Sequence, residues 1–421
     1  MLTGQLLLQL IVILLVVQLF GNLSRRIGQQ WVIGEILAGL ALGPSLLGAL
    51  WPNLASHLFP ASTLPTLQTL GDIGLILYMF SLGARLDTPM MLRQSRSAVF
   101  VSLSGILLPL ILGSLLGSFL FLYPGMAGSK ATYLSFVLLV GTAMAITAFP
   151  VLARLLAEKK MLGTKVGMLA LTCASVDDVI AWCLLAYVTS IANPHGTTLS
   201  VISTIALTIF FAVGMLLVVR PLLNYAVRRI QSKPLQMAFS IILLFSAAYT
   251  TNWIGIHPVF GAFLAGICLP RTVVFTAQVR SLDQVNTVIF LPIFFVYSGL
   301  KTQIGLIYGL PLWGLCLLVL LTACVGKILG GTLSTRMAGN SWRDALSIGV
   351  LMNTRGLVEL IVLNIGLQLG ILSPTLFAML VIMALVTTMM ASPLLPLLGY
   401  PRGKSTGYAI QADLEDAMEP S

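Results

Sequence analysis

The most informative part of the sequence is residues 172–182, TCASVDDVIAW. They lie inside an apolar segment, 163–192, that is long enough to cross a bilayer as a helix. Neighbouring residues on a helix point about 100° apart, so we expect Asp177 and Asp178 to face different surroundings, one a water-filled cavity and the other a partner. The simpler alternative is two buried carboxylates satisfied by hydroxyl groups. A structural role would not need both charges in lipid, so the pair is a candidate functional site.

Composition indicates the class of protein. The chain has 421 residues, of which 58% are hydrophobic and 9% charged, whereas soluble domains carry about 25% charged residues. We therefore expect an all-α polytopic membrane protein with about thirteen transmembrane helices of roughly 20 residues each. The expected segments are residues 4–22, 32–50, 66–84, 98–122, 133–156, 163–192, 199–219, 235–252, 257–270, 283–300, 307–335, 343–369 and 374–398.

The distribution of lysine and arginine predicts the orientation. These residues gather in the loops that follow the odd-numbered segments, while the opposite loops hold only Lys130 and Lys301. Because positive charge collects on the cytoplasmic side, we expect the N-terminus outside and the C-terminus inside, in a bacterial plasma (inner) membrane. The formal charge of +10 then reflects topology in the lipid bilayer, and we expect no nucleic acid partner.

Two of the expected segments have small, polar and irregular centres. Residues 141–150 read GTAMAITAFP, and residues 352–359 read MNTRGLVE. An ordinary proline kink at Pro150 is the alternative for the first. Broken helices are tolerated at membrane depth only where they line a cavity or are buried in protein. The two segments are seven apart in order, which reverses direction, so helices four to six and eleven to thirteen are predicted to form inverted repeats with two broken crossing helices, the arrangement of a transporter site.

Other polar side chains in the apolar segments are candidate members of this site. Lys327 needs a carboxylate partner, for which Asp177 and Asp178 are available, although snorkelling to an interface is an alternative. Arg355 and Glu359 are spaced i,i+4 and can pair on one helix face, with a structural role or a role in gating. Hydroxyl groups that could help to bind a cation lie at two positions, Thr147 and Ser175.

These residues together resemble the monovalent cation/proton antiporter-2 family, which includes bacterial sodium/proton antiporters, Kef-type potassium exchangers and plant cation/proton exchangers. The resemblance covers residues 5–396. The stretches that carry it are 32–36 VIGEI with 42–44 LGP, 148–154 AFPVLAR, the pair 177–178, 255–263 GIHPVFGAF and 353–360 NTRGLVEL.

The resemblance implies the sodium/proton antiporter fold, a homodimer, and roles for individual residues. Asp178 falls at the position that binds the cation or proton, and Asp177 at the position that pairs with the core lysine, here Lys327. Aspartate at 177 resembles the electrogenic sodium-type members, whereas the stretch 353–360 resembles the plant and potassium-linked ones, so the choice of ion stays open.

The resemblance also implies a division of labour along the chain. A scaffold that forms the dimer would come from helices one to three and eight to ten, joined by helix seven to a mobile core of helices four to six and eleven to thirteen. The corresponding ranges are 1–97 and 234–306 for the scaffold, 98–192 and 307–398 for the core, 193–233 for the linker helix and 399–421 for a cytoplasmic tail.

The predicted function is secondary active transport, with no enzymatic activity and no cofactor. A monovalent cation, Na⁺ or Li⁺, competes with protons at Asp178, which is the only predicted metal ligand and holds the ion as cargo. Desolvation raises the pKa of a carboxyl group and a nearby cation lowers it, so such a group can switch near the working pH. A K⁺/H⁺ antiporter of the same family and a Na⁺-coupled organic anion symporter are the alternatives. An intramembrane aspartyl protease is disfavoured because its carboxylates come from facing helices.

Overall fold

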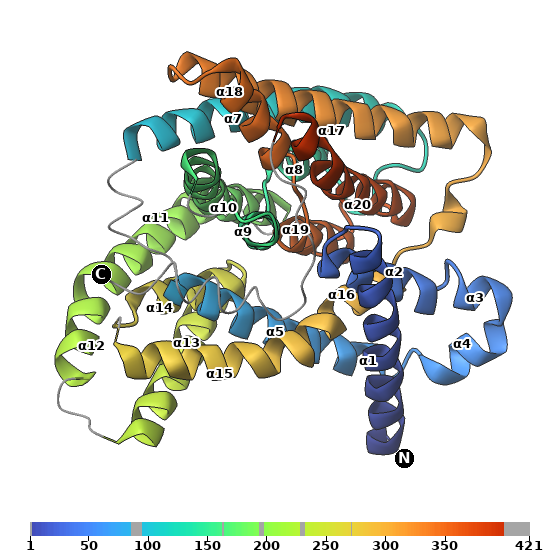
Figure 1. The fold of residues 1–421 in the computed structure, drawn as a ribbon. Helices are drawn as coiled ribbons and strands as arrows, with labels where there is room; N and C mark the ends of the chain where they lie inside the picture. The colour runs from blue at the N-terminus through green and yellow to red at the C-terminus, as the bar shows by residue number, and fades with distance from the viewer. Residues whose placement is uncertain are drawn as a thin grey trace. The chain divides into compact units, whose positions relative to one another are not determined.

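The structure is a computed structural model, and it describes residues 2–85, 95–161, 164–192, 198–227, 232–270 and 272–399. The predicted tail from residue 400 onward lies outside the described residues. The elements are helices, in the order α1 (Leu2–Arg26), α2 (Trp31–Leu42), α3 (Leu47–Leu50), α4 (Pro52–Leu58), α5 (Leu64–Arg85), α7 (Ser95–Leu122), α8 (Tyr133–Ala145), α9 (Phe149–Glu158), α10 (Lys165–Ala192), α11 (Thr198–Gly214), η1 (Met215–Val219), α12 (Arg220–Val227), α13 (Lys233–Ile254), α14 (Pro258–Cys268), α15 (Val273–Val288), α16 (Phe290–Leu300), η2 (Ile304–Leu306), α17 (Gly309–Met337), α18 (Trp342–Met352), α19 (Leu357–Gln368) and α20 (Pro374–Leu397) (Figure 1).

The lengths and hydropathy of these helices confirm the predicted class. In the part of the chain that the structure describes, ten helices are long and apolar enough to cross a membrane. Three shorter apolar helices, α8, α14 and α19, occupy the places of the fifth, ninth and twelfth predicted segments. The chain is an all-α membrane protein with interrupted fifth and twelfth segments.

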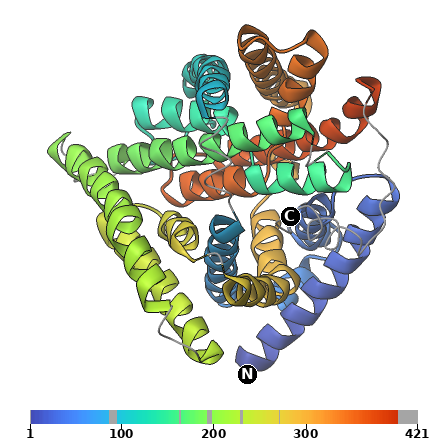
Figure 2. The same cartoon turned by 60° about the vertical axis from the view of Figure 1, so that its left-hand side comes forward.

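Several segment boundaries differ from the prediction for local reasons. The second segment is not one helix: α2 ends before an extended Gly43, and Pro44, which lacks a backbone N–H, cannot continue it. The tenth begins earlier, at Val273, and is interrupted at Ile289 between α15 and α16. The seventh runs on through a π-helical turn, η1, into α12, and the green ribbon continues across it in Figure 2.

The chain divides into two compact units. The first combines Met1–Leu15, Trp51–Met90 and Ala186–Tyr297. Within it α14 packs against α5 and α13. The approach of α5 to α14 is close because a Cβ at Gly83 would collide with the backbone of Phe263, and one at Gly266 with that of Phe80. Small residues allow such backbone contact between membrane helices.

The second unit combines Val16–Leu50, Met91–Leu185 and Ser298–Ser421. Here α7 and α17 lie side by side, α8 packs against α7, and α18 and α20 pack against α17 (Figure 1). The loops that follow α7 and α19 are joined by backbone bonds, because the N–H of Gly128 donates to Ile371 and that of Lys130 to Gly370, both at 2.9 Å. This unit contains both interrupted segments.

Candidate functional site

The first interruption lies between α8 and α9. A capping box at Thr132, in which Thr132 and Ser135 exchange side-chain and backbone hydrogen bonds, starts α8. The helix ends at Ala145, and Ile146 is extended (φ −75°, ψ 140°). Pro150 falls in the first turn of α9, where its missing N–H costs no helical hydrogen bond. The sequence therefore favours two short helices over one continuous helix.

The second interruption lies between α18 and α19. Gly356 has φ 156° and ψ −119°, a conformation that side chains strongly disfavour. A Cβ at this position would also lie 2.6 Å from Cγ2 of Val151. A glycine is therefore required where the chain re-enters helix α19.

The two interruptions touch each other. The N–H of Ala148 donates to the carbonyl of Thr354 at 3.1 Å, and the hydroxyl of Thr147 lies 2.8 Å from the carbonyl oxygen of Met352. Unwound backbone at membrane depth needs such partners, since no water is present in hydrocarbon to replace the lost helical bonds. The predicted crossing of two broken helices is confirmed.

Both carboxylate oxygens of Asp177 on α10 accept hydrogen bonds. Its Oδ1 accepts from the Ser102 hydroxyl at 2.6 Å, and its Oδ2 accepts from Thr147 at 2.8 Å and from Nζ of Lys327 at 2.9 Å. The side chains of the ion pair are 1% exposed for Lys327 and fully buried for Asp177. The predicted pairing of Lys327 with an aspartate is present, and snorkelling is excluded.

Asp178 has a different environment. It is buried, and neither of its carboxylate oxygens accepts a hydrogen bond that meets the geometric limits from the residues described. The backbone N–H of Phe149, the first residue of α9, interacts with it. A helix N-terminus carries partial positive charge and favours an anion. A carboxylate so placed has acceptor capacity left for a further positive charge.

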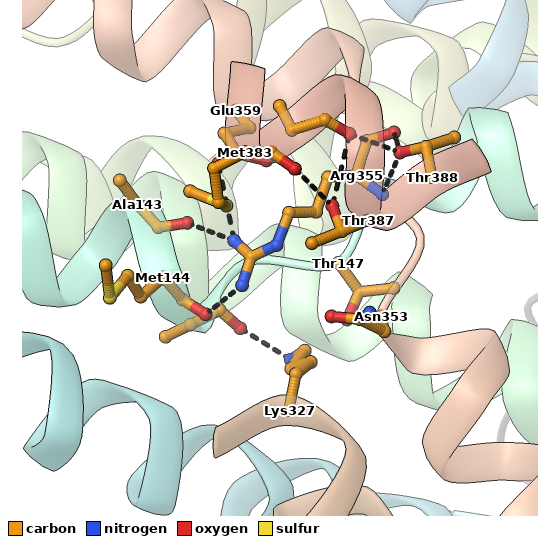
Figure 3. A network of polar contacts seen from close by, with 12 residues as sticks. Ala143, Met144, Thr147, Lys327, Asn353, Arg355, Glu359, Met383, Thr387 and Thr388 are labelled. Carbon is orange, nitrogen blue, oxygen red and sulfur yellow. Dashed lines mark hydrogen bonds and ion pairs between the residues drawn. The ribbon is translucent and has the colours of Figure 1, made fainter. Parts of the chain in front are cut away.

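Two cations face the end of α8. Arg355 donates from Nη1 to the carbonyl of Ala143 at 2.6 Å and from Nη2 to that of Met144 at 2.7 Å, while Lys327 donates to the carbonyl of Ala145 at 2.5 Å. Figure 3 shows Arg355 and Lys327 directed at this same helix end. The last carbonyls of a helix have no intrahelical partner and carry partial negative charge. The two side chains therefore neutralise the end of a helix that stops inside the protein.

Two predicted members of the site differ in detail. Arg355 and Glu359 do pair, at 3.3 Å, but Arg355 precedes the first residue of α19 and lies in the interruption, so they do not share a helix face. Ser175 donates its hydroxyl hydrogen to the carbonyl of Leu171, one turn back on α10. The observed hydrogen bonds of the aspartate pair do not include Ser175.

The sequence reading missed two hydroxyl donors in the site. Ser102 on α7 binds Asp177, and Thr388 on α20 binds the backbone of Arg355. Both are polar residues buried in apolar helices. A polar residue in an apolar segment could have been noted from the sequence, but the sequence does not show which group it contacts.

Buried carboxylates and cations around a crossing of broken helices, within a bundle of membrane-spanning helices, define a secondary transporter and not an enzyme. The model of the family described as "Sodium/hydrogen exchanger, transmembrane" matches residues 11–398. The chain belongs to this family, and it is a cation/proton antiporter.

Similar proteins include relatives named for different ions. The chain is 44% identical over 391 residues to "Na(+)/H(+) antiporter NhaS4" of Synechocystis sp., covering 91% of this chain and 95% of that protein. It is 32% identical over 403 residues to "K(+)/H(+) antiporter 1" of Saccharomyces cerevisiae, covering 93% of this chain and 46% of that protein. The chain thus spans about half the length of the plant and yeast relatives it matches.

The fold is also similar to a solved structure. The sodium proton antiporter MjNhaP1 from Methanocaldococcus jannaschii at pH 8 superposes with a TM-score of 0.67 at 16% sequence identity, covering 99% of this chain and 100% of that one. At 16% identity this similarity shows the fold alone.

Proposed function

We propose that the protein exchanges a monovalent cation, Na⁺ or Li⁺ in preference to K⁺, for protons by competition at Asp178. The observation that carries this proposal is the difference between the two adjacent aspartates. Asp177 is occupied by Lys327 and two hydroxyls, whereas both oxygens of Asp178 are buried and, among the described residues, have no ion-pair or side-chain hydrogen-bond partner. A buried carboxylate without a positively charged partner is costly unless a proton or a cation neutralises it.

The charges around the crossing support one exchangeable positive charge. Among the described residues of the network, three carboxyl groups face two cations: Asp177, Asp178 and Glu359 against Lys327 and Arg355. Asp177 pairs with Lys327 and Glu359 with Arg355, which leaves Asp178 without a cation in this network. Either a proton or a monovalent cation on Asp178 makes the network neutral.

Coupling then follows from the cost of moving charge through an apolar barrier. A core with Asp178 loaded is neutral and can change its access from one side of the membrane to the other, whereas the empty carboxylate opposes the movement. In this proposal residues 98–192 and 307–398 form the mobile core, residues 1–97 and 234–306 the scaffold, and residues 193–233 the linker. The hydroxyl groups of Thr147 and Ser175 and the carbonyls freed at the crossing serve as further oxygen ligands for a dehydrated cation.

Flux in proteoliposomes tests the role of Asp178. The variant Asp178→Asn keeps the size of the side chain but can neither lose a proton nor hold a cation by charge, so we expect no exchange in a dye-based assay of internal pH. Asp177→Asn is the matched control on the same helix, and we expect it to retain exchange at a reduced rate. Exchange by Asp178→Asn at the wild-type rate would refute the assignment.

The same vesicles distinguish the two ions. The aspartate at position 177 supports Na⁺, while the relative named for K⁺/H⁺ exchange favours K⁺ as the alternative. We expect half-maximal exchange at a lower concentration of Na⁺ than of K⁺. The reverse order would assign the protein as a K⁺/H⁺ antiporter with the same site.

The assembly and orientation are part of the proposal. The family resemblance supports a homodimer, and the alternation of basic loops supports an external N-terminus and a cytoplasmic C-terminus in a bacterial inner membrane. Cross-linking in membranes and labelling of a cysteine placed at each terminus test these two points separately.

A further inference from the structure

Two neighbouring threonines on α20 behave differently, although both are buried. Thr387 donates only within its own helix, to the carbonyls of Met383 and Ala384. Thr388 instead reaches the interruption between α18 and α19: its Oγ1 accepts from the N–H of Arg355 at 2.9 Å and lies 2.8 Å from the carbonyl oxygen of the same residue. Figure 3 shows Thr388 beside the backbone of Arg355.

The contact satisfies backbone groups that the interruption leaves without helical partners. The hydroxyl accepts one hydrogen bond from the N–H of Arg355. Its single hydrogen serves one carbonyl at a time, that of Arg355 or that of Ala384, each at 2.8 Å. An unsatisfied backbone N–H is costly in a buried site. The following residue, Gly356, adopts a conformation that gives no helical support, so the backbone at 355 depends on this side chain.

The inverted repeat gives the contact a counterpart. α10 and α20 are the last helices of the two repeats. Asp177 on α10 binds Thr147 of the first interruption, 30 residues earlier, and Thr388 on α20 binds Arg355 of the second interruption, 33 residues earlier. In each repeat a polar residue of the third helix therefore fixes the interruption of the second.

From these contacts we infer that Thr388 is a positioning residue for the exchange reaction, acting through Arg355. It holds the backbone of Arg355 so that the guanidinium group reaches the carbonyls of Ala143 and Met144 at the end of α8. This inference rests on the proposed function, because it assigns Thr388 a part in moving the loaded core and not in binding the ion.

The expected effect therefore falls on turnover and not on ion affinity. Without the hydroxyl, the guanidinium group is held less firmly at the end of α8, whose partial negative charge is then compensated mainly by Lys327 when the core crosses the apolar barrier. We expect Thr388→Val to lower the rate at saturating cation about tenfold, the scale set by one unsatisfied buried hydrogen-bonding group. The KM for the cation should change less than about twofold, since Thr388 makes no contact with either aspartate among the interactions of the described network.

The experiment compares Thr388→Val with two matched variants, per folded protein in proteoliposomes. Thr388→Ser keeps the hydroxyl, and we expect it to exchange within about twofold of the wild type. Thr387→Val removes a buried hydroxyl one residue away that serves only its own helix, and we expect wild-type turnover. Wild-type turnover in Thr388→Val, equal losses in both valine variants, or a Thr388→Val effect confined to KM would overturn the inference.

Two further measurements separate action through Arg355 from general damage to the fold. Hydrogen exchange of peptides covering 353–360 should be faster in Thr388→Val and unchanged in Thr387→Val. In the background of Arg355→Met, adding Thr388→Val should cause no further loss, because the two residues act as a unit. An additive loss overturns the inference. Failure of the proposed function is distinguished by Asp178→Asn, which would then exchange normally whatever the Thr388 variants do.

Discussion

Replacing Lys327 with methionine removes the positive charge beside Asp177 while keeping a side chain of similar length. Nζ of Lys327 lies 2.9 Å from Oδ2 of Asp177 and 2.5 Å from the carbonyl oxygen of Ala145, and both side chains of the ion pair are buried. Removing one partner of a buried ion pair costs roughly 3–5 kcal/mol because an uncompensated charge remains. The hydroxyls of Ser102 and Thr147 stay as donors to the carboxylate, so we expect the lower end of this range, about 3 kcal/mol.

The loss should depend on pH in a defined direction. Once its cation is gone, the Asp177 carboxyl group can take up a proton instead, and this costs little in acid. At alkaline pH the folded protein must either hold an unpaired buried carboxylate or bind a proton against the solution pH. The difference in stability between the variant and the wild type should therefore grow as the pH is raised from about 5 to about 9. The same loss of charge favours proton binding at the site, so the acid limb of the exchange profile should move to higher pH.

Thermal unfolding in detergent at one fixed scan rate measures this effect, and the fixed rate matters because large membrane proteins often unfold irreversibly. A loss of about 3 kcal/mol should lower the apparent unfolding temperature by roughly 3–4 °C, because the entropy of unfolding scales with the 421 residues of the chain. The double variant Lys327→Met, Asp177→Asn removes both charges and should recover most of that loss. Equal destabilisation at both ends of the pH range, or a double variant no more stable than the single one, would refute the reasoning.

Two further predictions concern the interruption and the donors around it. Gly356→Ala should lower the free energy of unfolding by about 2–4 kcal/mol and abolish exchange, since its φ of 156° and the 2.6 Å approach to Val151 both oppose a Cβ. Gly339→Ala, with φ 87° and open space around it, controls for backbone strain alone in the same unfolding assay. Equal effects of the two substitutions would contradict the steric argument. Ser102→Ala removes a 2.6 Å hydrogen bond to the Asp177 carboxylate and should lower the free energy of unfolding by about 1.5–3 kcal/mol. Exchange should be retained, with the acid limb of its pH profile displaced to higher pH. An unchanged pH profile would show that this hydroxyl has no influence on the site.

The sequence predicted those parts of the fold that depend on local chemistry. Pro150 and Gly356 mark two places where a helix cannot run on, and both interruptions were predicted from them. The pairing of Lys327 with an aspartate could also be predicted, because a lone buried cation requires a carboxylate and few are available in apolar segments. Such local signals restrict the backbone conformation at their own positions, whatever the distant contacts are.

The rest of the site depends on contacts that no local signal encodes. Arg355 was expected to pair with Glu359 along a helix, but its guanidinium group also serves carbonyls more than 200 residues earlier, in α8. Ser102 reaches Asp177 across 75 residues and Thr388 reaches Arg355 across 33. A serine or threonine in a membrane helix can equally bind its own helix, as Thr387 and Ser175 do. Only the packing of α7, α10 and α20 decides between these possibilities.

The two interruptions occupy corresponding places in the two repeats, but the helices that support them carry different side chains. α10 presents a pair of carboxylates to the crossing, whereas α20 presents the single hydroxyl of Thr388 at the corresponding place. Carboxylates on both helices would set further negative charge against the same two cations, Lys327 and Arg355, and an empty core would then need several positive charges before it could cross the apolar barrier. The hydroxyl of Thr388 satisfies the interrupted backbone and adds no charge. In the proposed mechanism, this asymmetry between α10 and α20 lets an inverted-repeat fold hold a single exchangeable charge, as exchange by competition at Asp178 requires.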